Sequence, residues 1–289
     1  MIPCPFEYYA PTTVAEAIEL LERFGDEARI LAGGHSLLPA MKLRLAAPAV
    51  LIDITRIAEL RGISTEGMVR IGATTTWSEI EGHAGLRRAV PALPEAVSLI
   101  GDLQVRNRGT LGGALAHADP AADAPAVVLA LDARIEARGP TGERSIPVDG
   151  FFTDMLTTAL QPAEVLTAVV MSPLGAGEGA AYVKYRHPAS GYAIVGVAAY
   201  VKLTDGQVSA CRLAVTGAGP MAVRRSGVEH ALLGTDGSSA AIAAAAAIAS
   251  EGMDILDDLH AGEEYRRAMV NVYARRALAA AVERARSRI

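Results

Sequence analysis

The chain has 289 residues, of which 51% are hydrophobic and 20% charged, and its formal net charge is −5. This composition is that of a globular protein with room for a large core or two domains, and it excludes a disordered chain. The acidic balance and the dispersed basic residues argue against nucleic acid as the main partner. Without an apolar run long enough to span a membrane or a signal-peptide pattern, the sequence predicts a cytoplasmic protein.

Short helices and strands alternate through the first 174 residues, which is typical of an α+β domain. Thr13 to Glu16 and Thr76 to Glu79 have the form of capping boxes, and the first opens a helix that ends at Phe24. Asp119 followed by Pro120 predicts an N-cap and the start of another helix. The helices expected are 14–24, a short one after 76, 86–100 with interruptions at Pro91 and Pro94, and 119–131. The strands and hairpins expected are 29–32, 50–54, 62–74, 133–148 and 164–171.

Three glycines within residues 175–179 predict a linker, and a second domain follows it to residue 289. Its expected strands are 181–185, 192–203 and 207–217, with a hairpin turn at Asp205 and Gly206. Its expected helices are 223–233, 238–250 and 263–286. A small sheet covered by helices is therefore expected at the C-terminal end.

Two glycine pairs carry most of the functional information. The first, in Ala32-Gly33-Gly34-His35-Ser36, follows a predicted strand. The second, in Thr110-Leu111-Gly112-Gly113, lies in the segment 101–117, which we expect to be irregular. A glycine lets backbone N–H groups approach an anion because no Cβ is in the way. Two such turns indicate a dinucleotide held from both sides, and we favour ligand contact over a purely structural role for His35 and Ser36.

Several polar residues near the second turn have two interpretations. Asp119 fits a helix cap better than a ligand contact. For Asp123, a favourable interaction with the helix dipole and a hydrogen bond from ribose or a flavin N–H are equally open. Arg106 and Arg108 could offset pyrophosphate charge, although isolated arginines are more often solvated. Tyr192 could be only a strand aromatic.

Common catalytic and nucleotide motifs are missing. The chain has no G-x-G-x-x-G, no phosphate loop, no H-E-x-x-H and no G-x-S-x-G. Its cysteines, Cys4 and Cys211, are too few for an iron–sulfur cluster and have no metal-ligand spacing. We therefore expect neither catalytic residues nor metal ligands on this chain.

Taken together, these motifs resemble the FAD-binding medium subunits of the molybdenum hydroxylases, and the carbon monoxide dehydrogenase type most of all. The resemblance covers nearly the whole chain; it rests on 32–39, 104–113, 119–123, 184–186, 190–199 and the arginine-rich last helix. It implies a two-part FAD-binding domain of the vanillyl-alcohol oxidase (PCMH) type over residues 1–174. Residues 175–289 would form a C-terminal flavoprotein domain with an antiparallel sheet packed against helices.

The resemblance also assigns site residues by position. Backbone N–H groups of the two glycine turns would bind the FAD pyrophosphate, Asp123 and Lys184 would contact FAD, and Tyr192 would lie beside the isoalloxazine on the side facing an iron–sulfur protein. Ala114 stands where the family often has Asn. The implied FAD-binding residues are Ala32, Gly33, Gly34, His35, Ser36, Ile100, Thr110, Gly112, Gly113, Asp123, Leu166, Lys184 and Tyr192, with Ile100 and Leu166 as apolar neighbours of the flavin.

The family further implies two partner subunits, and the large one would carry the catalytic residues that this chain lacks. A molybdopterin centre on that large subunit oxidises the substrate, and two [2Fe–2S] clusters on a small subunit pass electrons to FAD and then to an external acceptor. The assembly implied is a dimer of heterotrimers, free in the cytoplasm or at the inner face of the membrane.

Carbon monoxide is the leading substrate, with an aldehyde, a purine such as xanthine or an N-heterocycle as alternatives. A stand-alone FAD oxidoreductase resembling enolpyruvyl reductase and a non-enzymatic nucleotide-binding protein are further alternatives.

Overall fold

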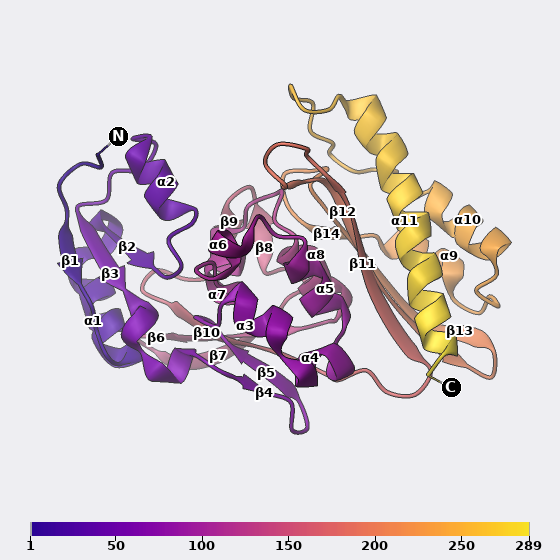
Figure 1. Cartoon of the computed structure of the whole chain (residues 1–289), viewed down its shortest axis with the longest axis horizontal. Coiled ribbons are helices and arrows are strands. Elements are labelled where there is room, and N and C mark those ends of the chain that lie inside the picture. Colours follow the sequence, from indigo (N-terminus) through magenta and orange to yellow (C-terminus); the bar gives the residue numbers. More distant parts are fainter. Residues whose placement is uncertain (1, 289) are drawn as a thin grey trace.

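The structure of the chain is a computed structural model that describes residues 2–288. Figure 1 shows an N-terminal part of short helices and strands beside a C-terminal sheet covered by helices. The N-terminal part ends with strand β10 at Met171, and the C-terminal part begins with strand β11 at Glu178. This arrangement confirms the predicted α+β fold class.

Two main sheets build the N-terminal part. A small parallel sheet has the order β1-β3-β2, and a larger antiparallel sheet has the order β4-β5-β10-β6-β7. The last strand of this part, β10, lies at the centre of the larger sheet, between β5 and β6. The strands are β1 (Glu7–Tyr9), β2 (Ala28–Leu31), β3 (Val50–Asp53), β4 (Ile63–Ser64), β5 (Val69–Gly72), β6 (Arg134–Gly139), β7 (Gly142–Pro147), β10 (Val165–Met171) and the separate hairpin β8 (Phe152–Asp154) and β9 (Thr157–Thr158).

Helices of the N-terminal part bury apolar side chains against these sheets. Helix α1 begins after Thr13, whose side chain accepts a hydrogen bond from the amide of Glu16, and it packs on the small sheet. Helices α3, α5, α7 and α8 pack on one face of the larger sheet. The helices are α1 (Val14–Phe24), α2 (Leu37–Lys42), α3 (Trp77–Gly82), α4 (Ala84–Ala89), α5 (Ala92–Ser98), α6 (Leu103–Arg106), α7 (Leu111–His117) and α8 (Ala124–Ala130).

The C-terminal part is one antiparallel sheet with a layer of helices. Its strand order is β11-β12-β13-β14, and the turn at Asp205 and Gly206 joins β12 to β13 as predicted. Helix α11 crosses the outer face of the sheet (Figure 1). The elements are β11 (Glu178–Arg186), β12 (Ala193–Thr204), β13 (Gln207–Thr216), β14 (Val223–Arg224), α9 (Ser226–Leu232), α10 (Ser239–Ala247) and α11 (Glu263–Arg286).

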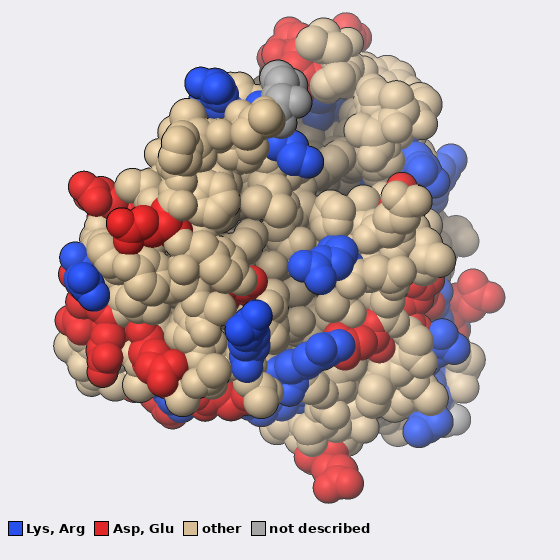
Figure 2. Space-filling model, turned by 60° about the vertical axis from the view of Figure 1, so that its left-hand side comes forward, with Lys and Arg blue, Asp and Glu red and all other residues tan. Residues whose placement is uncertain are grey.

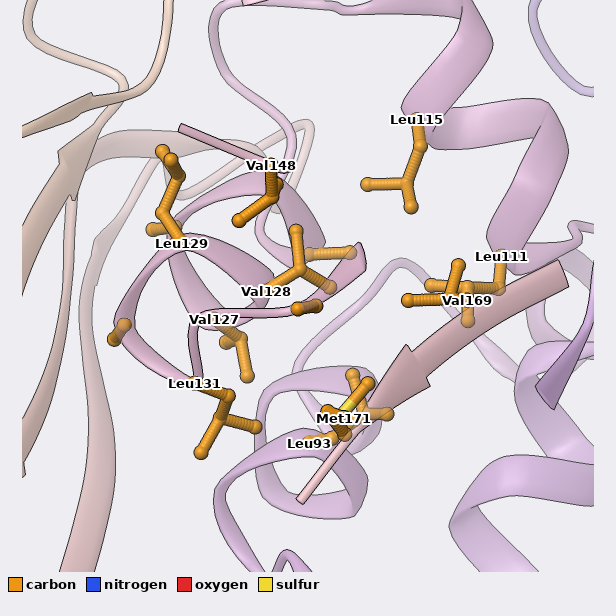
Figure 3. Packing of buried hydrophobic residues seen from close by; sticks show 14 of the residues in the cluster. Leu93, Leu111, Leu115, Val127, Val128, Leu129, Leu131, Val148, Val169 and Met171 are labelled. Carbon is orange, nitrogen blue, oxygen red and sulfur yellow. The ribbon is translucent and has the colours of Figure 1, made fainter. Parts of the chain in front are cut away.

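The C-terminal sheet is apolar on both of its faces. Side chains alternate between the two faces of a strand. On β12, Val195 and Val197 belong to the core under α9, α10 and α11, whereas Ala198 and Tyr200 belong to the core of the N-terminal part. Helices α5 and α8 pack against this face of the sheet and contribute to the core of the N-terminal part, some of whose side chains are shown in Figure 3. The two parts therefore share one continuous hydrophobic interior.

The segment 101–117, expected to be irregular, contains two short helices instead. The glycines Gly112 and Gly113 lie in the first turn of α7, which Thr110 caps by accepting a hydrogen bond from the amide of Gly113. A Cβ on Gly112 would lie 2.5 Å from the Cβ of Ala73. Gly112 has to be small because the first turn of α7 packs against Ala73, the residue that follows β5, a contact that local sequence does not reveal.

Asp119 does not cap a helix, and the predicted helix 119–131 is wrong in its first turn. Helix α8 begins only at Ala124, and the Asp119 carboxylate accepts a hydrogen bond from the amide of Ala121. The C-terminal part holds this segment out of the helix, because the hydroxyl of Thr216 donates to the carbonyl oxygen of Pro120 at 2.8 Å. Asp119 and Asp123 consequently do not share a helical face.

Three further boundaries differ from the prediction. The expected helix 86–100 is split at Pro91 into α4 and α5, whereas Pro94 lies in the first turn of α5, where no N–H is needed. Gly179 belongs to β11 and not to the linker; a Cβ there would lie 2.1 Å from the carbonyl oxygen of Ala281 in α11. The segment expected as a helix from Val223 begins with the short strand β14.

Replacing Leu93 by alanine should lower the free energy of unfolding by roughly 2–5 kcal/mol, because the side chain is fully buried where α5 packs in the N-terminal core. Urea unfolding followed by circular dichroism measures the change. Leu259→Ala is the matched control, since that leucine is 91% exposed and its loss should cost less than about 0.5 kcal/mol. Equal effects of the two substitutions would contradict the assigned core.

Candidate FAD-binding site

The two glycine turns lie against each other at one edge of the N-terminal part. The first turn follows β2, and a Cβ on Gly33 would lie 2.2 Å from the carbonyl oxygen of Arg108. A Cβ on Gly113 would lie 3.6 Å from the Cβ of Ala32. Only glycine at position 33 permits this approach, so the two sequence motifs, which lie far apart in the chain, form a single cradle.

Backbone donors in the cradle come from the first turn. Within residues 2–288, the amides of Gly33, Gly34, His35 and Ser36 donate to no acceptor. Gly34 has a φ of +77°, a left-handed conformation that suits glycine. Consecutive amides of this kind form an anion-binding concavity. The first turn therefore offers a group of backbone donors that would suit a phosphate group.

The second turn contributes in a different way. The amide of Leu111 donates to the carbonyl oxygen of Thr75, and the amide of Gly112 donates to that of Ala73. The amide of Gly113 donates to the hydroxyl oxygen of Thr110. Since these amides already have acceptors, the second turn offers the hydroxyl hydrogen of Thr110 and a surface without bulky side chains.

A hollow of about 120 Å³ opens beside the two turns. Its lining is rich in hydroxyl, amide and guanidinium groups, which suits a polar anion better than an apolar ligand. On the face that brings the N-terminal part forward, Figure 2 shows several basic side chains across the middle, with other basic side chains and most of the acidic ones toward the edge. The lining residues are Ala32, Gly33, Thr55, Arg61, Thr74, Thr76, Asn107, Arg108 and Thr110.

The two arginines considered from the sequence, Arg106 and Arg108, make different contacts in the structure. Arg108 lines the hollow with an exposed side chain. Arg106 instead forms an ion pair with Glu81 at 2.8 Å and donates to the carbonyl oxygen of Ile100 at 3.0 Å. Of these two arginines, Arg108 is therefore the one placed to meet a bound anion in the hollow, while Arg106 supports the backbone at Ile100.

Asp123 and Lys184 form a buried ion pair between the two parts of the molecule. The Nζ of Lys184 lies 2.8 Å from Oδ2 of Asp123 and 3.1 Å from the carbonyl oxygen of Leu99. The hydroxyl of Tyr182 donates to Oδ1 of the same carboxylate. The side chains of Asp123 and Lys184 are only 5% and 2% exposed. Asp123 thus occupies the position before α8, but its carboxylate serves this cluster and makes no capping hydrogen bond.

Electrostatics of the cluster follow from its burial. Burial raises the pKa of the Asp123 carboxyl, and the neighbouring Lys184, Tyr182 and Arg186 oppose that shift. Burial also raises the pKa of the Tyr182 hydroxyl well above its ordinary value, so Tyr182 remains a donor. Burial removes the water that would stabilise the ionised carboxylate, and the hydrogen bonds from Lys184 and Tyr182 replace part of that stabilisation.

The remaining predicted residues lie near this cluster or in the core below it. Ile100 follows Leu99 and packs on the N-terminal core, which includes the buried Leu166 of β10. Tyr192 is 47% exposed on the loop between β11 and β12. Gly191 approaches the backbone of Gly101, so this loop lies beside the segment of Ile100. The contacts of all these residues with FAD stay a prediction.

Sequence reasoning missed Tyr182 and Gly196. Tyr182 precedes Lys184 by two positions, a spacing that places both side chains on one face of a strand, so the signal was present. Gly196 pairs with Lys184 in the β11–β12 register, and no local pattern marks that pairing.

Comparison with known proteins agrees with this geometry. Residues 4–172 match the family of the FAD binding domain in molybdopterin dehydrogenase, and residues 180–281 match the CO dehydrogenase flavoprotein C-terminal domain. The chain belongs to this family of FAD-binding medium subunits, which act within oxidoreductase complexes. No helix within residues 2–288 is both long and apolar enough to cross a membrane.

Individual relatives match over the whole length. The chain is 43% identical to the carbon monoxide dehydrogenase medium chain of Hydrogenophaga pseudoflava, covering 97% of this chain and 98% of the relative. It is 38% identical to 6-hydroxypseudooxynicotine dehydrogenase complex subunit alpha of Paenarthrobacter nicotinovorans, covering 99% and 97%. A solved structure of the Hydrogenophaga pseudoflava carbon monoxide dehydrogenase, which lacks the Mo-pyranopterin moiety of the molybdenum cofactor, has a TM-score of 0.96 at 44% identity and covers 98% of this chain and 99% of the solved chain.

Replacing Gly33 by alanine should lower FAD affinity by roughly tenfold or more, because the new Cβ would overlap the backbone at Arg108 and push the two turns apart. Titration of the purified apoprotein with FAD, followed by flavin fluorescence, measures the affinity. Gly82→Ala is the matched control, since a Cβ there meets nothing within 4 Å. Unchanged affinity in Gly33→Ala would show that the first turn does not bind the cofactor.

Proposed function

We propose that this chain is the FAD-carrying electron-transfer subunit of a heterotrimeric molybdenum hydroxylase, with carbon monoxide as the substrate of the complex. The observation that supports it most is the full-length similarity to a carbon monoxide dehydrogenase medium chain, combined with the cradle of the two glycine turns. The domain boundary proposed is near residue 174, between β10 and β11.

The residues present fit FAD. The first turn, Ala32 to Ser36, would hold the pyrophosphate through its amides, and Thr110 would add its hydroxyl beside Gly112 and Gly113. Asp123 and Lys184 would contact polar atoms of FAD, with Ile100, Leu166 and Tyr192 around the flavin. FAD supplies the redox chemistry when bound. The chain contributes binding, orientation and exclusion of water.

Electrons would reach this chain from [2Fe–2S] clusters on a small subunit, after oxidation of the substrate at a molybdopterin centre on a large subunit. The chain has two cysteines, fewer than the four ligands that a cluster usually needs. Burial raises the pKa of the Cys211 thiol to about 12, so this cysteine is poorly suited to bind a metal. We propose a dimer of heterotrimers that delivers electrons to an external acceptor.

A second candidate is the equivalent subunit of a complex that oxidises an aldehyde, xanthine or an N-heterocycle. The similarity to a subunit of a 6-hydroxypseudooxynicotine dehydrogenase complex favours this alternative specifically. The substrate would be selected on the large subunit, so the two candidates make the same demands on the FAD site of this chain.

Purification of the tagged chain from its native host should yield a complex with flavin and iron–sulfur absorption that contains a molybdenum subunit and an iron–sulfur subunit. Under anaerobic conditions, carbon monoxide should bleach its flavin absorption, while glyceraldehyde and xanthine should not. Bleaching by one of the latter compounds alone would establish the second candidate. A chain that neither contains FAD nor binds added FAD would overturn the proposed function.

A further inference from the structure

Tyr182 occupies a space that a glycine on the neighbouring strand leaves open. Tyr182 and Lys184 point to the same face of β11, toward the N-terminal part, and Lys184 pairs with Gly196 of β12. A Cβ on Gly196 would lie 2.3 Å from the hydroxyl oxygen of Tyr182 and 3.1 Å from its Cζ. Any larger residue at position 196 would therefore displace the tyrosine hydroxyl.

The hydroxyl completes the hydrogen bonding of a buried carboxylate. Oδ1 of Asp123 accepts from Tyr182, and Oδ2 accepts from Lys184. Lys184 also donates to the carbonyl oxygen of Leu99, which links the ion pair to the backbone just before Ile100. Without the Tyr182 hydroxyl, one oxygen of a carboxylate that is only 5% exposed would lose its donor, which is costly for a buried charge.

We propose that Tyr182, held against Gly196, is a positioning residue for the FAD site: it keeps Asp123 ionised and oriented, and thereby keeps Lys184 charged and in place beside Leu99 and Ile100. This inference rests on the proposed function, in which Asp123 and Lys184 contact FAD. Tyr182 itself acts through the carboxylate and is not assigned a contact with the cofactor.

The charged and titratable groups around Asp123 define the expected pH dependence. They are Tyr182, Lys184 and Arg186 from β11 and Tyr192 from the following loop. Of these, Tyr182 and Lys184 donate hydrogen bonds to the carboxylate. Each donor lowers the pKa of Asp123 and so counteracts the effect of burial. When one donor is removed, the pKa of Asp123 therefore rises further. On acidification, the ion pair is then lost at a higher pH than in the wild type.

Tyr182→Phe tests the inference in the full chain. Its FAD affinity, measured by fluorescence titration of the apoprotein, should fall about tenfold at neutral pH, because a hydrogen bond to a charged group is lost. The acid side of its profile of affinity against pH should shift to higher pH. A role in folding alone would leave that midpoint unchanged, and a thermal melt reports folding separately.

Tyr200→Phe is the matched control. Tyr200 is a buried tyrosine facing the same core, and its hydroxyl interacts with Glu178, away from the cluster. This variant should bind FAD with the wild-type affinity and pH profile. Equal behaviour of Tyr182→Phe and Tyr200→Phe would overturn the inference.

Gly196→Ala gives a second route that keeps the tyrosine but displaces its hydroxyl. It should reproduce the affinity loss and the pH shift, and combining it with Tyr182→Phe should add little further loss. Wild-type affinity and pH profile in Gly196→Ala would also count against the inference. If the wild-type chain fails to bind FAD, the proposed function fails; if it binds FAD and the variants match it, only the positioning role fails.

Discussion

The four-stranded C-terminal sheet has to bury both of its faces, and the rest of the architecture depends on that requirement. Helices α9, α10 and α11 cover one face, and α5 and α8 of the N-terminal part cover the other. Each fully buried valine or leucine adds roughly 1.5–3 kcal/mol to the association of these layers. Because the interface is a core and not a hinge, side chains contributed by the two parts keep fixed relative positions. A cofactor site assembled across this interface can therefore be rigid, because the packed core already fixes the two parts relative to each other.

The ion pair of Asp123 and Lys184 lies within that apolar interface, where charges are expensive. A buried pair is weak as a source of stability, since the loss of solvation can exceed the attraction between its members. Here each member has further partners: Tyr182 on the carboxylate and the Leu99 carbonyl on the ammonium. Such complete hydrogen bonding preserves the charges and fixes their directions. The pair is better explained by the orientation of polar groups for a ligand than by the stability of the fold.

Local signals predicted the elements whose boundaries are set locally. Helix α1 follows from its cap at Thr13, and α11 from its charge and apolar pattern, with the same bounds in prediction and structure. Prediction failed where distant groups decide the backbone. The carbonyl oxygen of Pro120 is held by Thr216, which prevented the expected helix start at Asp119. For the site, residue identities were available from the family resemblance, whereas the role of Gly196 depends on strand register.

The two glycine pairs look alike in sequence, yet the physical reasons for them differ. Gly33 and Gly34 leave a turn with amides that have no acceptor in the described chain, so their pattern is that of a binding element. Gly112 and Gly113 lie in a helix whose first amides are already hydrogen bonded, so their small size serves close packing on Ala73 and the neighbouring turn. The second pair therefore shapes the cradle that the first pair lines with donors. A substitution in the second pair can impair binding without removing a backbone donor, because a Cβ on Gly112 would meet Ala73 and a Cβ on Gly113 would lie 2.7 Å from the Thr110 hydroxyl oxygen.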